Sequence, residues 1–426
     1  QNKMKKALPI VFILISIYSF SQTTIKLMNY NLLNFNNYTS YCDQTNNSHV
    51  AKAGYLKTIV QNQEPDLLAV CELGTSPSVT YTINYILGNS LNVGGETKWA
   101  ATNTSSSSYL ANGLFYDKNK FEYIGHEVVA TGIRDINIYK LKYIENGENI
   151  LMNIVVLHLK AGNSSSDASQ RGEMVDYLMT RISNLGNSNE NFIVTGDFNV
   201  YTSNETAFQK LINPNDIQYT FYDPINQIGA WGNNYTFREH HTQSTHLDDN
   251  DCHSYGGMND RFDFILIAGS IKDGSANIKY KTDSYKVVGQ DGLRFNKSLI
   301  SPSNTSLPQE VITALYEMSD HLPVVAEFYM GEQNSSISLT TDPQFYANVV
   351  NPIDDKLVFK LQTIYKNKII NLRLMNISGA IVYETQILTQ TDQIYSYDMT
   401  GLSKGVYILN FNGEGINQSV KLVKTE

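Results

Sequence analysis

Several short apolar runs in this sequence of 426 residues end at side chains that could bind a cation or move a proton. The clearest run is Phe192 to Val194, which is followed by Gly196, Asp197 and Asn199. The two polar residues are two positions apart, so they point the same way if the chain stays extended. Gly196 would permit a sharp turn at the end of this strand. Asp and Asn are also common turn formers, so the segment alone leaves both interpretations open.

Other predicted strands also end in polar residues. Asn31 closes an alternating strand that begins at Thr24, and Glu72 follows an apolar run that begins after Pro65. A Glu in this position is costly to bury unless it is paired or binds a metal, although a carboxylate at the rim could also reach water. His158 ends a third apolar run, where a lone His more often makes a core hydrogen bond than takes part in catalysis.

Two more predicted strands have polar residues near their start. One is Asp260–Ile267, which contains Asp263, and the other is Ser319–Phe328. Carboxylate and amide oxygens suit a hard divalent cation such as Mg²⁺, Mn²⁺ or Ca²⁺, while imidazoles and further carboxylates can position water and stabilise charge. The full set of candidates is Asn31, Glu72, His158, Asp197, Asn199, Asp263, Asp320 and His321.

The elements that must position these residues alternate between strand and helix. Helices are predicted for His49–Gln63 and Gln170–Leu185, with a polar loop at Ser164–Asp167 before the second. Strand, helix and strand in this order indicate α/β layers. Beyond a polar linker at Gly331–Thr341, short β runs separated by turns predict a small all-β sandwich.

Residues 201–260 are aromatic and polar and show no clear period. His240, His241 and His246 lie here, but they lack the Cys/His spacing of a zinc site, so a solvated loop is the better interpretation.

The first residues predict export. Lysines after Met4 precede an apolar run from Ala7 to Tyr18, and small residues lead to an expected cleavage site near Ser21. The run is shorter than the roughly 20 apolar residues that span a bilayer, so we expect no membrane span and a soluble mature protein.

Charge and cysteine content narrow the function classes. Residues 22–336 carry 21 Lys and Arg against 33 Asp and Glu, a net charge of −12, so binding of a polyanion would need a local patch or a metal. This argues against a dedicated DNA-binding module. Cys71 lies in an apolar strand and is expected to be buried, and a bridge between Cys42 and Cys252 is possible but not decided by the sequence.

Six segments, taken in order, carry a family resemblance. They resemble the endonuclease/exonuclease/phosphatase superfamily over about residues 24–330. The resemblance implies an α/β fold, a four-layer α/β/β/α sandwich whose strand ends meet in one cleft, and metal-assisted attack of water on a phosphoester. The segments are Tyr30-Asn31-Leu32, Pro65 to Glu72, Leu157-His158, Gly196-Asp197-Phe198-Asn199, Phe262 to Leu266 and Ser319 to Val324.

The resemblance also implies a metal site. Glu72 would be the principal ligand, with Asn31 and Asp320 at or beside the metal, which would be Mg²⁺ or Mn²⁺, with Ca²⁺ as a further candidate. His158 would donate to a phosphate oxygen or to the leaving group, as in the pancreatic-deoxyribonuclease-like branch. That branch has an acidic partner for this His ahead of a central strand, whereas Tyr109 to Phe115 contains no acid.

The remaining matches imply roles in moving protons. Asp197 would align or deprotonate the attacking water, and Asn199 would orient that water and the phosphate. Asp263 would hold His321 in one tautomer, so that His321 can contact the phosphate or accept a proton.

The end of the chain resembles a second family, the C-terminal sorting domains of type IX secretion cargo in Bacteroidota. The match covers about residues 340–426 and includes Asn351-Pro352, Gly379 to Tyr383, Leu402 to Tyr407 and Lys421 to Lys424. It implies export across the outer membrane by the type IX machinery, with the tail cut off or exchanged for an anchor. A carbohydrate-binding or adhesive sandwich is the alternative, although no aromatic platform is evident.

We therefore expect a signal peptide at residues 1–21, a catalytic domain at 22–330, a linker at 331–341 and a sorting β-domain at 342–426. The expected protein is a secreted or surface-attached monomer that hydrolyses DNA as an endonuclease. A phospholipid or sphingomyelin phosphodiesterase, or a phosphatase, could use the same centre. A binding protein with a decayed centre is the third hypothesis, and the intact polar set argues against it.

Overall fold

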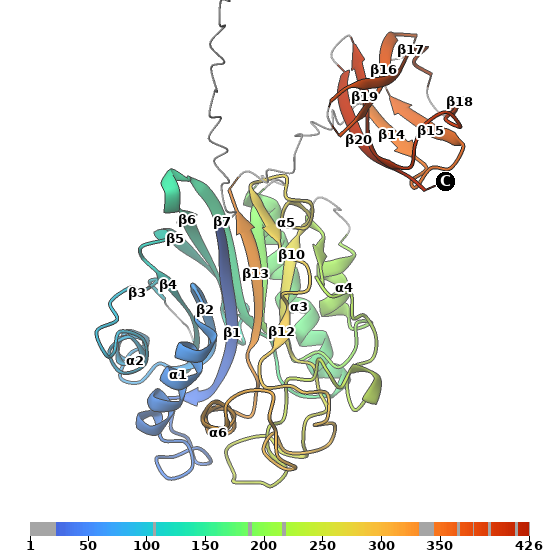
Figure 1. The fold of residues 1–426 in the computed structure, drawn as a ribbon. Coiled ribbons are helices and arrows are strands. Elements are labelled where there is room, and N and C mark those ends of the chain that lie inside the picture. Colours follow the sequence, from blue (N-terminus) through green and yellow to red (C-terminus); the bar gives the residue numbers. More distant parts are fainter. Residues whose placement is uncertain are drawn as a thin grey trace, which may run out of the picture. The chain divides into compact units, whose positions relative to one another are not determined.

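The computed structural model describes two compact units, Gln1–Gln333 and Asn334–Glu426 (Figure 1). The predicted signal peptide at residues 1–21, and the predicted linker after Gly331, lie outside the described residues. The described residues are 23–104, 108–185, 190–214, 219–331, 345–363, 367–377, 379–390, 393–413 and 416–425.

The first unit contains two mixed β-sheets. The strands of the first sheet are, in spatial order, β11 (Ile278–Tyr280), β13 (Val324–Met330), β1 (Thr23–Phe35), β2 (Leu67–Gly74), β4 (Leu110–Asp117) and β3 (Trp99–Ala101), with β12 (Lys286–Val287) also paired to β13. The strands of the second sheet are β5 (Phe121–Val129), β6 (Ile136–Tyr143), β7 (Ile150–His158), β8 (Asn191–Asp197), β10 (Asp263–Ala268) and β9 (Phe221–Tyr222).

The central strands of the second sheet are apolar on both faces. Ile193 of β8 belongs to the core that also contains the first sheet, whereas its neighbour Val194 belongs to the core beneath α3 and α4. Successive residues of a strand point to opposite faces, so this run fills two cores at once. Ile154 and Val155 of β7 divide in the same way.

Helices complete the layers on both sides (Figure 1). Residues of α1 and α6 share a core with the first sheet, and residues of α3 and α4 share one with the second. The unit is therefore the predicted four-layer α/β/β/α sandwich. The α-helices are α1 (His49–Gln63), α2 (Val79–Ile86), α3 (Ser165–Leu185), α4 (Thr206–Ile212), α5 (Gly269–Asp273) and α6 (Gln309–Met318), and single turns of other helix types lie at Leu87–Leu91, Glu145–Gly147 and Tyr235–Phe237.

The start of α3 corrects one prediction. The polar loop expected at Ser164–Asp167 is the beginning of the helix, which starts at Ser165. The Asp167 amide donates to Ser164 Oγ at 3.1 Å, and the Ser164 amide donates to Asp167 Oδ2 at 3.2 Å. This reciprocal pair satisfies amides that the first helical turn leaves free, so these polar residues cap a helix.

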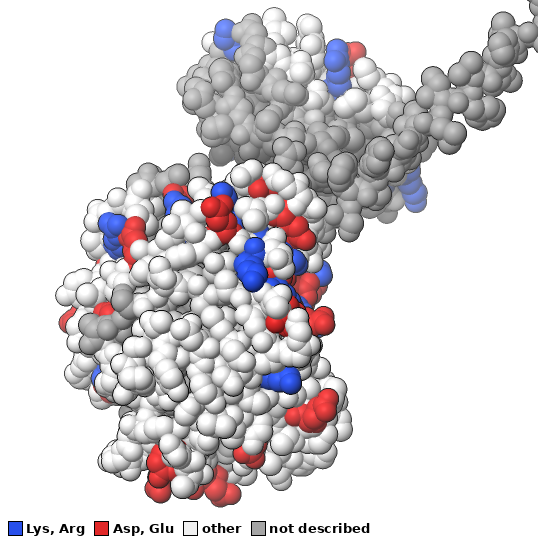
Figure 2. Space-filling model, turned by 90° about the vertical axis from the view of Figure 1, so that its left-hand side faces the viewer, with Lys and Arg blue, Asp and Glu red and all other residues white. Residues whose placement is uncertain are grey.

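The described residues form no large basic patch on the face of this unit drawn in Figure 2. Lys and Arg lie beside Asp and Glu in its upper part, and its lower edge shows Asp and Glu only. On this face, the structure agrees with a body that has no general attraction for polyanions.

The second unit is all β. One of its antiparallel sheets contains β14 (Phe345–Val349), β15 (Lys356–Thr363) and β18 (Ile394–Asp398). The other contains β17 (Ile381–Leu388), β16 (Ile369–Asn376), β19 (Gly405–Gly413) and β20 (Ile416–Lys424). Side chains of both sheets share one core, which confirms the predicted small sandwich.

Candidate active site and metal centre

The strand directions bring the predicted residues to one end of the two sheets. β1 and β2 are parallel, as are β7 and β8, so polar residues at their carboxyl ends meet at a common edge. β10 is antiparallel to β8, and the first residue of β10, Asp263, pairs with Asp197. On the other side of β8, Asp197 pairs with His158.

Gly196 is needed for close approach rather than for the sharp turn that the sequence predicted. It lies within β8 with φ 139°, and the strand continues to Asp197. A Cβ atom at this position would lie 1.8 Å from the backbone oxygen of Leu157 on β7. Only glycine lets the two strands approach this closely while leaving His158 and Asp197 side by side.

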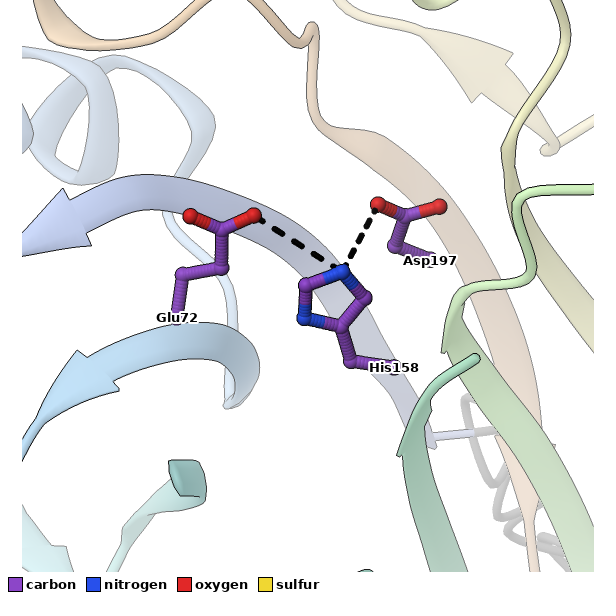
Figure 3. Close-up of side chains that lie close together, drawn as sticks. All are labelled: Glu72, His158 and Asp197. Carbon is purple, nitrogen blue, oxygen red and sulfur yellow. Dashed lines mark ion pairs between the residues drawn. The ribbon is translucent and has the colours of Figure 1, made fainter. Parts of the chain in front are cut away.

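Glu72, His158 and Asp197 form the central group, in which one ligand atom from each residue lies within 4.8 Å of the others (Figure 3). His158 Nε2 is 3.7 Å from Glu72 Oε1 and 3.5 Å from Asp197 Oδ2. Burial lowers the pKa of His158 well below its ordinary value, and the charges of Arg134 and His321 lower it further. The imidazole is therefore neutral at pH 7, and depending on its tautomer Nε2 can bind a cation or donate a hydrogen bond.

Asn31 bridges the two carboxylates of this group. Its Nδ2 donates to Glu72 Oε1 and to Asp197 Oδ2, both at 3.0 Å, and lies 3.5 Å from His321 Nε2. Its Oδ1 accepts from the Leu33 amide at 2.9 Å. In this orientation the amide nitrogen, rather than the oxygen, faces the carboxylates.

The backbone around Glu72 is unusual. Glu72 has φ 63°, and the pairing of β2 shifts register here. Its Oε2 accepts from the Asn34 amide at 2.8 Å, and Leu33 and Asn34 also have positive φ values. Residues other than glycine rarely adopt a positive φ. Backbone strain of this kind is found mainly at functional sites.

Lys52 of α1 stabilises this turn through hydrogen bonds. Its buried Nζ donates to the backbone oxygens of Leu32 and Leu33 at 2.7 and 2.6 Å, and to Asn47 Oδ1 at 2.7 Å. Burial lowers the pKa of Lys52 to about 7, against the opposing effect of the charges of Glu72 and Asp320. Sequence periodicity placed this residue on a helix but gave no sign that it supports the site.

Asp263 and His321 form a buried pair, with Asp263 Oδ2 2.7 Å from His321 Nδ1. Burial alone would lower the pKa of His321, but the charges of Asp263 and Asp197 raise it well above its ordinary value. With Nδ1 donating to Asp263, the neutral ring presents Nε2 as an acceptor, 3.7 Å from Asp197 Oδ2. The raised pKa favours the charged ring at neutral pH, in which Nε2 carries a proton and can donate to a phosphate oxygen.

Asp197 is itself a perturbed acid. Burial raises its pKa to about 7; the charge of His321 lowers it, and those of Asp263 and Glu72 raise it. Its Oδ1 accepts from the Asn199 amide at 2.9 Å, which is a turn contact, while Oδ2 faces Asn31 and the histidines. One oxygen of this carboxylate thus makes the turn contact that the sequence allowed, and the other lies among the candidate site residues.

Two predicted residues lie beside the central group. Asn199 has φ 51°, and its Nδ2 donates to the backbone oxygen of Leu159 at 3.2 Å. Asp320 Oδ2 accepts from Gln243 Nε2 at 3.0 Å and from the Ser254 amide at 2.8 Å. Asp320 is outside the group formed by Glu72, His158 and Asp197.

Gln243 is the main contact that the sequence did not reveal. Besides Asp320, its Nε2 lies 2.7 Å from His321 Nε2. It belongs to the segment without periodicity, and only tertiary structure brings it here. Ser319 was also missed as a support: its hydroxyl donates to the Asn31 backbone oxygen at 2.7 Å and accepts from the His321 amide at 3.1 Å.

The same segment corrects the prediction of a solvated loop for two of its three histidines, while His240 is half-buried. His241 and His246 are buried, with 0% and 9% exposure. His241 Nε2 lies 3.0 Å from the Trp231 backbone oxygen, and His246 stacks on His253 with ring centroids 3.8 Å apart. Hydrogen bonding and stacking let neutral imidazoles fill a core, and burial lowers the pKa of both to about 4.

The cysteines resolve the question that the sequence left open. Cys42 and Cys252 form a disulfide across 210 residues, and Cys71 is free and buried. The bridge joins the loop after β1 to the segment that carries Ser254.

The residues fit a divalent cation. Two carboxylates and a neutral imidazole offer converging ligand atoms. Asp320 Oδ1 is a buried acceptor without a hydrogen-bond partner in the described part of the chain. Such an acceptor is costly unless a cation or water satisfies it. Oxygen-rich sets of this kind hold Mg²⁺ or Mn²⁺, and an imidazole is also compatible with Mn²⁺.

Several solved structures resemble this chain. One is D. rerio TDP2 complexed with a single-strand DNA product, at 13% identity and TM-score 0.46, covering 72% of this chain and 100% of that one. Another is the human Nocturnin catalytic domain with bound sulfate anion, at 14% sequence identity and a TM-score of 0.45. That match covers 72% of this chain and 94% of the Nocturnin chain. A third is an endonuclease/exonuclease/phosphatase family protein from Bacteroides thetaiotaomicron, at 14% sequence identity and a TM-score of 0.46. That match covers 74% of this chain and 98% of the other. No curated protein sequence matches.

The second unit carries an export signal. Residues 351–425 match the secretion system C-terminal sorting domain, which confirms the predicted type IX tail. The chain is thus exported by type IX secretion to the cell surface or the outside. Within the described residues, no helix has the length and apolar character needed to cross a membrane.

Residues 28–321, nearly all of the first unit, match the sequence model of the Endonuclease/Exonuclease/phosphatase family. Members of this family are phosphoester hydrolases that depend on a divalent metal. The match spans every strand end that contributes to the central group. The chain therefore belongs to the endonuclease/exonuclease/phosphatase family and is a phosphoester hydrolase.

Proposed function

We propose that this protein is an extracellular endonuclease that hydrolyses DNA with the help of Mg²⁺ or Mn²⁺. The observation that carries the proposal is that the Asp263–His321 pair adjoins the Glu72, His158 and Asp197 group, with His321 Nε2 3.7 Å from Asp197 Oδ2. The first offers ligands and a base, and the second offers a group that can hold a proton or a phosphate oxygen. Hydrolysis of a phosphodiester needs both functions in one place.

In this proposal Asp197 aligns or deprotonates the attacking water. A carboxyl group with a pKa of about 7 can take up and release a proton near neutral pH, as a general base must. The Asn199 amide fixes one oxygen of Asp197 and leaves the other to act. The side chain of Asn199 orients the water and the phosphate.

Asp263 keeps His321 in the tautomer whose Nε2 faces the reaction centre. There His321 stabilises charge that develops on the phosphate, or accepts a proton. Neutral His158 donates a hydrogen bond to a phosphate oxygen or to the leaving group, while its ring stays within reach of both carboxylates.

Glu72, Asn31 and Asp320 would hold the cation, with His158 and Asp197 next to it. When bound, the cation supplies Lewis-acid stabilisation of the phosphoryl oxygens. Asn31 serves by holding Glu72 and Asp197 together, or by turning its amide so that its oxygen faces the cation. Gln243 keeps Asp320 and His321 in fixed positions.

One observation favours a second substrate class. The net charge of −12 on residues 22–336 opposes binding of a long polyanion, which suits a membrane-presented phospholipid or a small phosphoester. A bound cation and local Arg or Lys side chains can offset this repulsion, so we retain DNA as the substrate.

A substrate panel tests the proposal. The purified protein is incubated with plasmid DNA, RNA, sphingomyelin and a generic phosphomonoester, each with Mg²⁺, with Mn²⁺ and with a chelator. Cleavage of DNA that requires the metal supports the proposal. Cleavage of sphingomyelin without cleavage of DNA would make the protein a lipid phosphodiesterase.

A further inference from the structure

An open pocket of about 450 Å³ adjoins the central group and has Glu72 in its wall. Its other walls come from the loop after β1, the start of β4, and the disulfide between Cys42 and Cys252. Its volume is of the size that holds a small ligand or one unit of a larger substrate. Because Glu72 is a proposed metal ligand, whatever fills the pocket lies next to the reacting phosphate.

Two tyrosines in this pocket are exposed although the backbone that carries them is fixed. Tyr41 is 69% exposed and Tyr109 is 64% exposed. The disulfide at Cys42 anchors the residue next to Tyr41, and the Tyr41 backbone oxygen accepts from Asn46 Nδ2 at 2.8 Å. Tyr109 immediately precedes β4, and its backbone oxygen accepts from the Thr75 amide. Large rings held in water on a rigid frame are typical of binding surfaces.

The pocket wall also contains one arginine side chain, that of Arg134. Arg134 Nη1 donates to the Leu159 backbone oxygen at 2.6 Å, and among the described residues no carboxylate pairs with this side chain. Glu72 and Asp251 line the same pocket. The proposed metal would neutralise the negative charge of Glu72. The remaining charges in the pocket wall would then be the negative charge of Asp251 and the positive charge of Arg134. An arginine in this setting suits a phosphate oxygen.

We propose that this pocket binds one unstacked nucleotide of a single polynucleotide strand, next to the phosphate that is cleaved. Tyr41 and Tyr109 stack on its base, and Arg134 contacts the flanking phosphate. The inference rests on the proposed nuclease function and makes it specific: the preferred substrate is single-stranded. Base stacking on aromatic side chains is the usual means of binding single strands without reading their sequence.

A phospholipid would fit this pocket less well. Acyl chains need a continuous apolar wall, whereas Asn34, Thr39 and Ser40 contribute polar atoms here. Tyrosines with a carboxylate could surround a quaternary ammonium headgroup, but the charge of Arg134 would repel it.

The test separates stacking, phosphate binding and catalysis. Three substrates are compared: a single-stranded oligonucleotide, the same sequence as a duplex, and an abasic deoxyribose-phosphate oligomer of equal length. Binding of the labelled oligonucleotide is also measured by fluorescence anisotropy with Mg²⁺ on an Asp197→Ala background, where turnover is suppressed. The variants are Tyr41→Ala, Tyr109→Ala, Arg134→Gln and Tyr41→Phe. Tyr177→Ala is the control, because Tyr177 is 54% exposed on α3 outside this pocket.

We expect each tyrosine-to-alanine change to raise KM and Kd for the single strand by roughly five- to a hundredfold, with little change in kcat. The abasic oligomer should be unaffected by these changes, Tyr41→Phe should retain binding, and Arg134→Gln should weaken binding of both oligomers. Wild-type protein should bind the single strand more tightly than the duplex.

Equal effects of the tyrosine variants on the abasic and normal oligomers would overturn the inference, as would a preference for duplex. Loss of sphingomyelin hydrolysis in these variants, with DNA binding unchanged, would assign the pocket to a lipid headgroup. Tyrosine-dependent DNA binding without any DNA cleavage would refute the nuclease function and leave the binding pocket standing.

Discussion

The pair formed by Asp263 and His321 offers a prediction that links stability, protonation and turnover. Replacing Asp263 with Asn removes one charge at nearly constant volume. Asp263 Oδ2 lies 2.7 Å from His321 Nδ1, and both side chains are buried. The variant therefore tests whether this charge holds the imidazole in its working state.

The magnitude follows from the burial of the pair. Breaking a buried ion pair by removing one partner costs about 3–5 kcal/mol, and Asn keeps some hydrogen bonding, so we expect about 3 kcal/mol. For a unit of roughly 300 residues, the entropy of unfolding is about 0.6 kcal/mol/K, so Tm should fall by about 5 °C. Turnover should fall by at least about a hundredfold, because His321 would lose its orientation and charge.

The sign of the pH dependence is fixed by the raised pKa of His321. The pair's contribution is fully present below the unfolded pKa of 6.5 and is lost as pH rises through the higher folded pKa. The stability difference between wild type and Asp263→Asn should therefore be largest below pH 6.5 and should shrink in alkaline solution.

Histidine NMR titration and thermal unfolding of the same samples check this prediction, with His321→Ala used to assign the resonance. Asp273→Asn, on the short helix α5, serves as the control. An unchanged His321 titration in Asp263→Asn, or an equal loss of Tm at every pH, would refute the reasoning.

Three further predictions concern the metal site and the domain boundary. A chelator should abolish hydrolysis, and Glu72→Gln should weaken metal binding measured by calorimetry more than it lowers turnover at saturating metal; full activity in excess chelator would rule out the scheme. A chain that ends at Gly331 should remain folded and active, and a joint loss of Tm and turnover would contradict the boundary. Lys52→Met should lower metal affinity while the fold persists. Because burial lowers the pKa of Lys52 to about 7, wild-type stability should rise from pH 7 toward 10.5, and chemical unfolding of Lys52→Met should lack that rise.

The sequence predicted the ends of β7 and β8 well because a polar residue after an apolar run is a local signal, whereas β1 continues past Asn31 to Phe35 and β13 begins only at Val324. A buried strand such as β8 alternates between two cores, and a polar residue that interrupts it is visible without any tertiary information. Alternating strands and helices indicated α/β layers, whereas the four-layer order came from the family resemblance. Asn31, Glu72, His158, Asp197 and the later residues thus converge because adjacent strands end together.

Contacts that depend on long loops were not predictable in this way. Gln243 and Ser254 reach Asp320 from a segment with no period, and the histidines there are buried by stacking that the sequence does not encode locally. Gly196 was interpreted as a turn former because a single sequence does not show that the backbone of Leu157 passes beside it. The Cys42–Cys252 bridge joins loops 210 residues apart, so it too required the fold.

The central claim is that Asp197 and His321 act together on one phosphate, and alanine substitution of each tests it most directly. Turnover and Tm are measured on Asp197→Ala, His321→Ala and the double variant. We predict a fall in kcat of at least about a hundredfold for each single change, a smaller change in KM, and a combined effect below the product of the two. Asp197→Ala should retain or gain Tm, because burial and neighbouring carboxylates already disfavour its charge. If Asp197 is only a turn former, that variant will instead show a lowered Tm with near-normal turnover, which would contradict the account.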